Sequence, residues 1–480
     1  MQGEQNTVAQ QSGRSRPERG QELELDVHAL AFGGEGVARL GKDGYVVFVA
    51  GGIPGDRVRA VVHKSKRNYA HARALEVLRE SPERIAVTAQ HPGVPWQVMP
   101  YERQLQIKQE QVAEALRRLG GLDGFELEPI LPAVQRWRYR NKLEYSFGHS
   151  PGDGQLQCGF HAPAGFNQVV AIEDCLLASE LGNLARREAL AWAREHDLRA
   201  WDRGRGREAE QRTAVPPDGR ALLRNLVVRE GRRTERLQVR LVSTDGELDV
   251  QSLAHTLNEA LGERLSGVLW TRSGALAETT AGGETELVWG EDELPERLGE
   301  LDLRIACEAF FQTNTEMAEV LYGVVGDYAA LQGWERVFDL YCGIGTIAQT
   351  LAPRAGEVWG IEMVHGAVAN AISAAQRNEI TNVHFFAGDT RLALPELLER
   401  AGRPDVVVLD PPRAGLSQKV VRRVIEASPK RIVYVSCNPT TLAPNAAQLV
   451  EAGWTLRKVR PVDMFPQTHH VECVALLERG

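Results

Sequence analysis

The sequence lacks the features of a membrane-spanning, secreted or disulfide-stabilised protein. No uninterrupted apolar run approaches the roughly 20 residues that cross a bilayer, and residues 1–20 contain no apolar core like that of a secretory signal. The six cysteines are scattered and form no C-x-x-C pair, which argues against a disulfide scaffold or a zinc finger and for a reducing compartment. We therefore expect a cytoplasmic protein that does not span or bind a membrane and has no metal site.

An overall excess of positive charge is also missing. The formal net charge is −8, so the chain as a whole gives no signal for nucleic-acid binding. The local distribution differs, because residues 57–84 hold eight Lys or Arg against three acids. A locally basic face suits contact with RNA or DNA, and a solvated charged surface accounts for the same counts.

The 480 residues are too many for one ordinary core, so roughly two to four domains are expected. Residues 1–20 are polar and predict a disordered tail. Residues 21–80 show period-two alternation between glycine turns, which predicts a small β-barrel of the OB type. Residues 81–305 predict a linker, an amphipathic helix over 101–119 and a central α+β domain.

Residues 306–480 change to regular strand–helix alternation, which predicts an α/β domain with a doubly wound parallel sheet. Two last segments, 456–461 and 471–478, predict an antiparallel pair at the sheet edge. The other expected strands lie at 336–341, 357–362, 383–387, 405–409 and 431–436, and the expected helices at 315–331, 366–378, 394–399 and 418–427.

The first of these strands runs into the glycine loop Cys342-Gly343-Ile344-Gly345. Glycines let the backbone pass close to a ligand, and an acid that ends the next strand, Glu362, suits the two hydroxyls of a ribose. Ala348 breaks the G-x-G-x-x-G dinucleotide fingerprint, and Asp339 suits a positively charged amino-acid tail. The arrangement resembles the S-adenosylmethionine site of class I, Rossmann-like methyltransferases, with an NAD site or a structural loop as alternatives.

A candidate nucleophile, Cys437, ends the strand predicted over 431–436. Parallel strands deliver their carboxyl ends to the ligand crevice, where a thiol can attack, although most free cysteines are small buried hydrophobes. Methylation at C5 of uracil needs a thiolate to add at C6, a methyl donor, and a base to remove the C5 proton. Glu472 fits that base, with an ordinary surface carboxylate as the alternative. Asp410 follows another strand end and can contact the donor or the uracil edge.

The motifs together resemble the RNA uracil-5-methyltransferases. Segment 21–80 resembles the TRAM domain, an RNA-binding barrel, and this points to the 23S rRNA (uracil-5-)-methyltransferase branch of the family. The resemblance rests on Phe311-Gln312-Thr313-Asn314, residues 339–345, Glu362, Asp389, residues 410–413, residues 436–439 and residues 463–472. It implies Cys437 as nucleophile, Glu472 as general base, and donor contacts from Gln312, Tyr341, Thr346, Glu362, Asp389 and Asp410. A tRNA uracil-5-methyltransferase and a non-catalytic RNA-binding or assembly factor remain the alternatives.

One departure from the family concerns iron. TRAM-bearing members usually hold a [4Fe–4S] cluster, and here only Cys175 matches one of its four cysteines. One thiol cannot hold a cluster that needs four, so we expect S-adenosylmethionine without an iron–sulfur cluster. The expected partner is RNA, most simply 23S rRNA, with no obligate protein partner evident. The candidate phosphate contacts are Arg57, Lys64, Lys66, Arg67, Arg138, Arg140 and Lys142.

Overall fold

The computed structural model describes residues 16–41, 44–89, 91–162, 165–201, 218–275 and 279–479. The predicted tail lies outside the described residues up to residue 15. The chain divides into two compact units. The first comprises residues 1–88, 94–111 and 467–470, and the second comprises residues 89–93, 112–466 and 471–480. In the described residues, no helix is both long and apolar enough to cross a membrane.

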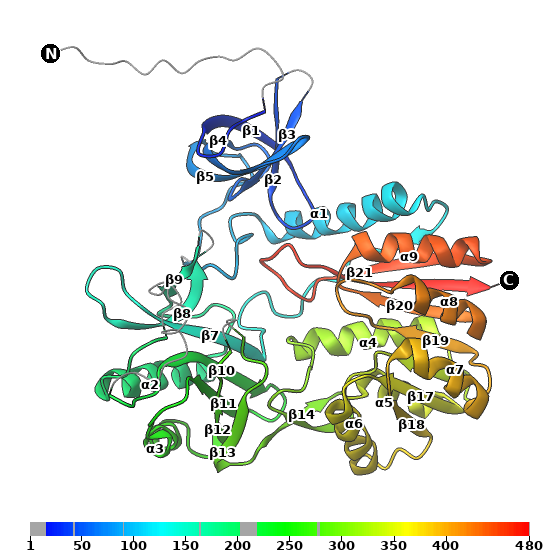
Figure 1. Ribbon diagram of the computed structural model, residues 1–480. Coiled ribbons are helices and arrows are strands. Elements are labelled where there is room, and N and C mark those ends of the chain that lie inside the picture. The colour runs from blue at the N-terminus through cyan, green and yellow to red at the C-terminus, as the bar shows by residue number, and fades with distance from the viewer. Residues whose placement is uncertain are drawn as a thin grey trace. The chain divides into compact units, whose positions relative to one another are not determined.

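The first unit contains a closed five-stranded barrel, as the sequence predicts (Figure 1). Its strands are β1 (Glu22–Leu30), β2 (Gly36–Leu40), β3 (Tyr45–Ala50), β4 (Arg57–Ser65) and β5 (Tyr69–Arg79), in the order β1-β2-β3-β5-β4. Alternation along each strand places small apolar side chains such as Val47, Ala60 and Ala72 inside. The intervening side chains face outward.

The same unit includes most of helix α1 (Tyr101–Glu114) and a short segment from near the end of the chain. Gln104 is fully buried, and its amide donates to the Gln467 side chain at 2.8 Å and accepts from the Gln467 N–H at 3.0 Å. Gln467 has a φ of 66°, a left-handed conformation that is uncommon for a residue with a side chain. The paired amides hold that conformation in place.

The central part of the second unit is built on a seven-stranded sheet, in the order β13-β12-β11-β10-β7-β8-β9. Within the predicted α+β domain, the sequence patterns predict strands at 142–147, 222–228, 237–242 and 267–272 and a helix at 178–196, and the structure has an element at each of these places. The patterns do not predict β8, β9, β13 and α3. The bounds are β7 (Lys142–His149), β8 (Leu156–Ala162), β9 (Gly165–Ala171), α2 (Glu180–Glu195), β10 (Leu223–Gly231), β11 (Arg236–Ser243), α3 (Val250–Leu261), η3 (Gly262–Arg264), β12 (Leu265–Arg272) and β13 (Glu284–Gly290). A separate hairpin joins β14 (Glu293–Leu298) to β15 (Leu301–Ala306).

The C-terminal part is an eight-stranded sheet in the order β18-β17-β16-β19-β20-β22-β21-β6. The first five strands in that order are parallel, which confirms the α/β class. The bounds are β6 (Glu126–Leu127), β16 (Arg336–Leu340), β17 (Glu357–Glu362), β18 (Val383–Ala387), β19 (Val406–Leu409), β20 (Arg431–Ser436), β21 (Trp454–Val462) and β22 (Glu472–Arg479). The last two strands pair antiparallel as expected, but β6 lies outside them and forms the edge. A two-residue strand is too short to leave a pattern in the sequence.

Helices lie on both faces of this sheet (Figure 1). They are η1 (Ala115–Leu119), which continues α1, α4 (Thr315–Ala329), α5 (Thr346–Leu351), η4 (Ala352–Arg354), α6 (His365–Arg377), α7 (Thr390–Ala401), α8 (Gln418–Ala427) and α9 (Pro439–Glu451). The sequence analysis missed α9, because Pro439 and Pro444 suggest a loop. Pro439 occupies the first turn, where its missing N–H is tolerated, and Asn438 caps the helix.

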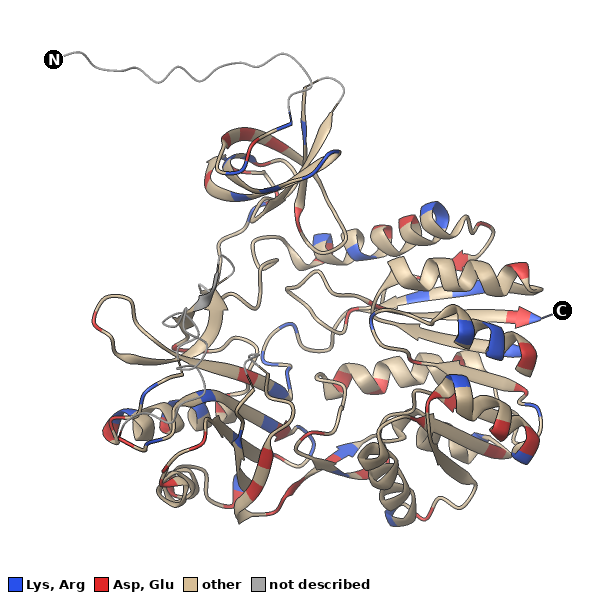
Figure 2. Ribbon diagram, in the orientation of Figure 1, with Lys and Arg blue, Asp and Glu red and all other residues tan. Residues whose placement is uncertain are grey.

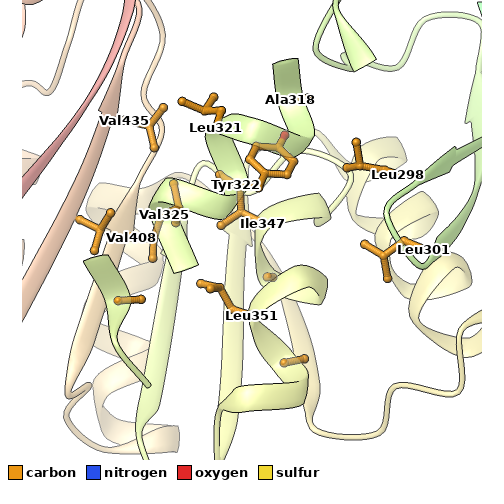
Figure 3. Close-up of a cluster of buried hydrophobic side chains, with 14 of the residues drawn as sticks. Leu298, Leu301, Ala318, Leu321, Tyr322, Val325, Ile347, Leu351, Val408 and Val435 are labelled. Carbon is orange, nitrogen blue, oxygen red and sulfur yellow. The ribbon is translucent and has the colours of Figure 1, made fainter. Parts of the chain in front are cut away.

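A large apolar core stabilises this part of the unit. Figure 3 shows Leu321, Tyr322 and Val325 of α4 beside Ile347 and Leu351 of α5. Buried valines of the parallel strands complete the cluster. The core holds the strands in register, and that register decides which residues meet at the carboxyl edge of the sheet.

Candidate active site

The carboxyl ends of β16, β19 and β20 lie side by side. Leu340 pairs with Leu409, and Leu409 pairs with Tyr434, so the residues that follow each strand emerge at one edge of the sheet. The N–H of Asp410 donates to the carbonyl of Leu340 at 3.3 Å, which fixes the start of the Asp-Pro-Pro-Arg loop against the neighbouring strand. Open α/β sheets bind their ligands at this edge.

Cys437 is half-buried and follows β20 directly. β20 and β22 are antiparallel, with Ser436 opposite Cys473, so Glu472 comes to the same end of the strand pair as Cys437. Burial raises the pKa of the Cys437 thiol to about 11, and the charges of Glu472 and Asp410 add to the shift. The free site therefore favours a protonated thiol at neutral pH.

Glu472 and Asp410 have raised pKa values in this site. Glu472 is only 5% exposed, and burial, with Asp410 adding, raises its pKa well above the usual range of a glutamate. Burial also raises the pKa of Asp410 to about 7. The structure thus brings the predicted Asp410, Cys437 and Glu472 together at this edge of the sheet. There the carboxylates of Glu472 and Asp410 oppose ionisation of Cys437, and that of Asp410 opposes ionisation of Glu472.

Arg413 supplies positive charge to this group. Its charge lowers the pKa of both Cys437 and Glu472, which opposes the effect of burial. The Arg413 carbonyl accepts hydrogen bonds from Asn438 Nδ2 at 3.1 Å and Thr441 Oγ1 at 3.3 Å. The loop that follows Asp410 is therefore braced against the segment that follows Cys437. In the sequence, Arg413 departs from the aromatic residue that amino-methyltransferases carry at this position, which argues against N-methylation, but its effect on Cys437 and Glu472 was not predicted. The Asn438-Pro439 pair, which is typical of a helix start, is the sequence feature from which an ordered segment after Cys437 could have been predicted.

The connection from β21 to β22, which precedes Glu472, is held by side chains of the central region. The Tyr139 hydroxyl donates to the carbonyl of Pro466 at 3.2 Å, and Asn314 Nδ2 donates to the carbonyl of Met464 at 2.9 Å. The Arg140 guanidinium lies 5.5 Å from the centre of the Phe465 ring. Sequence reasoning missed these contacts, because they join positions more than 100 residues apart.

In the glycine loop after β16, both glycines adopt the left-handed backbone conformation that glycine permits. Gly343 and Gly345 have φ values of 55° and 77°, and Tyr341 takes a φ of 69° without being glycine. A Cβ on Gly345 would lie 2.5 Å from the Phe385 ring, so a side chain does not fit there. A non-glycine residue in this conformation at a ligand-binding edge suggests that strain is retained for function.

Two of the predicted donor-binding residues, Glu362 and Thr346, lie at this loop. Glu362 ends β17, and its carboxylate accepts from the N–H groups of Gly343 at 3.1 Å and Val364 at 2.9 Å. Thr346 begins α5, and its hydroxyl lies 3.0 Å from that of Tyr322. Gln312 is buried, before α4.

Asp389, another member of the donor set, forms an ion pair with Arg391. Its carboxylate caps α7 through the N–H of Arg391 at 2.9 Å and also accepts from the guanidinium of Arg391. The neighbouring Arg391 holds the pKa of Asp389 below its usual range. Any contact with a ligand would have to share this carboxylate.

Asp339, which lies in the strand before the glycine loop, provides a test of whether this region fits S-adenosylmethionine, and it does. This residue is fully buried in β16, where Oδ2 accepts from the N–H of Ala348 at 3.0 Å. Oδ1 has no hydrogen-bond partner among the described residues. Burial, with Asp410 adding, raises the pKa of Asp339 to about 8. A buried carboxyl with an unused oxygen favours a cationic ligand nearby, and the sulfonium and ammonium groups of S-adenosylmethionine are cations.

The residues around Cys175 do not fit a [4Fe–4S] cluster. Cys175 Sγ lies 3.2 Å from Nε2 of His91, a partner that the sequence analysis did not foresee. Burial raises the pKa of Cys175 and lowers that of His91 to about 4, so both groups are neutral. Because His91 Nδ1 accepts from the N–H of Gly93 at 3.1 Å, the ring proton is on Nε2, which donates to the sulfur. Across the part of the chain that the structure describes, no group of three or more His, Cys, Asp or Glu is arranged to hold a metal ion.

Several of the predicted phosphate contacts are engaged within the protein. Arg138 forms an ion pair with Asp174, Lys142 pairs with Glu144, and Arg57 pairs with Glu24. These charges are therefore partly neutralised, and their contact with RNA stays a prediction. Lys64, Lys66 and Arg67 are exposed.

Comparison with known proteins identifies two domains in the chain. Residues 16–75 match the model of the TRAM domain, and residues 286–480 match the model described as tRNA (Uracil-5-)-methyltransferase. A Bacteroides thetaiotaomicron protein named as an uncharacterized RNA methyltransferase is 36% identical, over 94% of this chain and all of the relative. A Chlorobaculum tepidum protein of the same description is 37% identical, over 91% of this chain and 92% of the relative.

A solved structure gives the same picture. The crystal structure of the Pyrococcus abyssi tRNA (uracil-54, C5)-methyltransferase in complex with S-adenosyl-L-homocysteine matches with a TM-score of 0.72 and 25% identity. The match covers 95% of this chain and all of that one. It confirms the predicted fold class.

Proposed function

Because the chain belongs to the RNA methyltransferase family that joins a TRAM domain to a (uracil-5-)-methyltransferase domain, we propose that it makes 5-methyluridine in 23S rRNA. The methyl donor is S-adenosylmethionine, and the reaction passes through a covalent bond between Cys437 and C6 of the target uracil. The observation that carries this proposal is the meeting of Cys437, Glu472 and Asp410 at one edge of the sheet. A thiol and a carboxyl at that edge are the groups that C5 methylation requires.

The residues of the chain would act in sequence. Cys437 gives its proton to solvent water, and the thiolate adds to C6, which forms the S–C6 bond, breaks the C5–C6 π bond and makes C5 electron-rich. S-adenosylmethionine supplies an electrophilic methyl group to C5 when it is bound. Glu472 then removes the C5 proton, the S–C6 bond breaks, and the sulfur leaves as a thiolate. Glu472 must be ionised before it can take this proton, which the charge of Arg413 favours, and its raised pKa makes it a strong base once it is ionised.

The main obstacle to the first step is the raised pKa of Cys437, and Arg413 opposes it. With a pKa of about 11, Cys437 is almost entirely protonated at neutral pH, and only the thiolate attacks. Arg413 is the cation that lowers the pKa of both Cys437 and Glu472. We assign it the role of favouring the thiolate when the target base excludes water from the site.

The donor would bind in the glycine loop. Glu362 would accept hydrogen bonds from the ribose hydroxyls. The carboxyls of Asp339 and Asp410, which burial keeps largely protonated in the free site, would ionise when the cationic end of the donor binds beside them. The full set proposed for the donor is Gln312, Tyr341, Thr346, Glu362, Asp389 and Asp410. The solved relative contains S-adenosyl-L-homocysteine, the product that remains when the donor has lost its methyl group.

The RNA class separates the proposal from its alternatives. The solved relative is named for uracil-54 of tRNA, which supports tRNA as the second candidate substrate. Methyl transfer to 23S rRNA fragments and to tRNA transcripts, followed by mass spectrometry of 5-methyluridine, distinguishes the two. Product in tRNA alone would reject the rRNA assignment. RNA binding without product in either would favour a non-catalytic assembly factor. The free cysteines fit action in a reducing compartment such as the cytoplasm.

A further inference from the structure

The connection from β15 to α4, residues 307–314, is neither helix nor strand. We name it the donor segment, because it contains Gln312, a buried member of the set proposed for S-adenosylmethionine. A segment without a helix or a strand relies on neighbouring groups for most of its backbone hydrogen bonds. Two residues of the central sheet supply such bonds, one near each end of the donor segment.

Asn141, the residue directly before β7, holds the end that contains Gln312. Its Nδ2 donates to the carbonyl of Gln312 at 2.8 Å and to the Thr315 hydroxyl at 2.9 Å. Its backbone N–H donates to the carbonyl of Thr313 at 2.9 Å. Asn141 is only 3% exposed, so water does not compete for these bonds. One residue of the central domain therefore fixes the backbone of Gln312 and of the residue after it.

The position of Asn141 is itself fixed by its neighbours. Its carbonyl accepts from the N–H of Glu230 in β10 at 2.7 Å. The Thr315 hydroxyl, which accepts from Asn141, donates its own proton to Glu296 Oε2 at 3.0 Å. Figure 2 shows acidic and basic residues on the ribbons of the central sheet. Asn141 is neutral, so it donates to carbonyls without placing a charge in this buried region.

The other end of the donor segment is held by Arg229 of β10. Its guanidinium donates to the carbonyls of Ala306 at 2.9 Å and Ala309 at 2.7 Å. Arg229 is 4% exposed, and burial lowers its pKa to about 10, so it stays charged at neutral pH. It lies opposite Lys142, the residue after Asn141, on the neighbouring strand. Both ends of the donor segment are therefore held by adjacent strands of one sheet.

We propose that Asn141 is a positioning residue for the methyl donor, which holds the backbone of Gln312 so that the Gln312 side chain meets S-adenosylmethionine. The effect is confined to the donor, because Asn314 is fixed separately through its hydrogen bonds with Met464 and Met317. Loss of the Asn141 side chain therefore leaves the hairpin of Glu472 in place. This inference rests on the proposed function, since it takes Gln312 as a donor contact.

The first measurement is calorimetric binding of S-adenosyl-L-homocysteine to the full-length protein, which needs neither RNA nor turnover. Asn141→Ala keeps the backbone bond to Thr313 and removes the side-chain bonds to Gln312 and Thr315. It should weaken binding by about tenfold. In methylation assays it should raise KM for S-adenosylmethionine about tenfold, while kcat stays within about threefold of wild type.

Asn183→Ala is the matched control for a loss of folding stability. Asn183 is 1% exposed in α2, and its Nδ2 also donates to backbone carbonyls, those of Cys175 and Ser179. This variant should lower the melting temperature as Asn141→Ala does, yet keep donor affinity within about twofold. Thr315→Val, which removes one partner of Asn141, should weaken donor binding about threefold, and Thr315→Ser should restore it. The Thr315 pair decides the matter if Asn141→Ala does not fold.

A double-mutant cycle tests whether Asn141 acts through Gln312. Gln312→Ala should weaken donor binding, and adding Asn141→Ala should weaken it by no more than about a further twofold. Additive losses would overturn the proposal, as would normal donor binding by Gln312→Ala or by Asn141→Ala. An equal loss in Asn183→Ala would overturn it as well, because it would show only a general effect on the fold.

The same measurements keep this inference apart from the proposed function. A wild type that binds S-adenosyl-L-homocysteine but never methylates RNA, with weak binding by Asn141→Ala, would reject the enzymatic function and support the role of Asn141. A wild type that methylates RNA, with unchanged donor affinity in Asn141→Ala, would do the reverse.

Discussion

The carboxyl edge of the C-terminal sheet and the outer face of the barrel handle charge in opposite ways. The sheet edge buries carboxyls, and Asp339, Asp410 and Glu472 all have raised pKa values there. The barrel face exposes cations such as Lys66 and Arg67. At the sheet edge, carboxyls that would be ionised in water are favoured in the protonated form. On the barrel, the cations are exposed to water and keep their ordinary charge.

This difference indicates a division of roles. Buried groups with shifted pKa values are costly for the fold and are typical of sites that perform chemistry. Solvated cations beside flat aromatic rings such as those of Phe48 and Tyr69 cost little and suit binding of a polyanion. Substitutions at the sheet edge should therefore change turnover, while substitutions on the barrel should change affinity for RNA.

The largest effect is expected from Cys437→Ala. Loss of the thiol removes the S–C6 bond on which the reaction depends, so the rate of methyl transfer should fall by about 1,000-fold or more. Cys307→Ala, which removes a half-buried thiol before α4, should retain activity within about threefold. Single-turnover methylation with radiolabelled donor measures both. Residual activity above a tenth of wild type in the Cys437 variant would refute the covalent route.

Glu472→Gln should have the next largest effect. Without the base, removal of the C5 proton slows, and turnover should fall about 100- to 1,000-fold. Cys437 still attacks in this variant, so the adduct with ordinary RNA should accumulate and survive denaturing gel electrophoresis. A variant that is equally slow but leaves no adduct would place Glu472 before the addition step instead.

A comparison of two variants tests whether the sheet edge governs turnover and the barrel governs RNA affinity, and the expected change in affinity is about tenfold. Cys437→Ala should bind the RNA substrate within about twofold of wild type, because the nucleophile adds no affinity before the bond forms. Tyr69→Ala should lose about tenfold in affinity and should recover near-normal turnover at saturating RNA. Titrations of affinity and of saturated rate for both variants provide the measurement. If both variants lost affinity equally, the two roles would not be separate.

The smallest effect concerns stability. Burial raises the pKa of Asp410 to about 7, above its unfolded value, so the folded state favours the protonated carboxyl. The stability that this proton provides is present at low pH and is lost as pH rises toward and through about 7. Asp410→Asn should therefore raise the melting temperature by about 3 to 8 °C at pH 8 and by less at pH 5.

The control for this experiment is Lys66→Ala, which alters a solvated charge and should shift the melting temperature by less than about 1 °C at either pH. An equal gain for Asp410→Asn at pH 5 and pH 8 would show that Asp410 does not titrate as described. A loss of stability at pH 8 would show that its ionised form is favoured in the fold.

Most of the C-terminal domain could be predicted from the sequence, because local patterns determine it. Apolar runs such as those of β17 and β20 have the predicted bounds, and the residues that end them carry the motifs. The exceptions have physical causes. The two-residue β6 has no pattern of its own, and the prolines of α9 suggested a break where Asn438 and Pro439 begin a helix.

Contacts between distant residues could not be predicted. The sequence singles out Cys437 and Cys175 but not their surroundings, and the structure shows that Cys437 lies among titratable groups while Cys175 lies against His91. The brace between Arg413 and Asn438 depends on two loops that meet only in the folded sheet. The rings of Phe48 and Tyr69 come together because β3 and β5 are parallel neighbours, an arrangement that alternation alone does not determine.

The most direct test of the covalent mechanism uses RNA in which 5-fluorouridine replaces uridine. A base can remove a proton from C5 but cannot remove fluorine in the same way. The reaction should therefore stop after methyl transfer, with Cys437 still bonded to the RNA. With S-adenosylmethionine present, the wild-type protein should form an adduct that survives denaturation, and tandem mass spectrometry of the digest should locate it on Cys437. An adduct on any other residue, or no adduct with a protein that methylates ordinary RNA, would contradict the account.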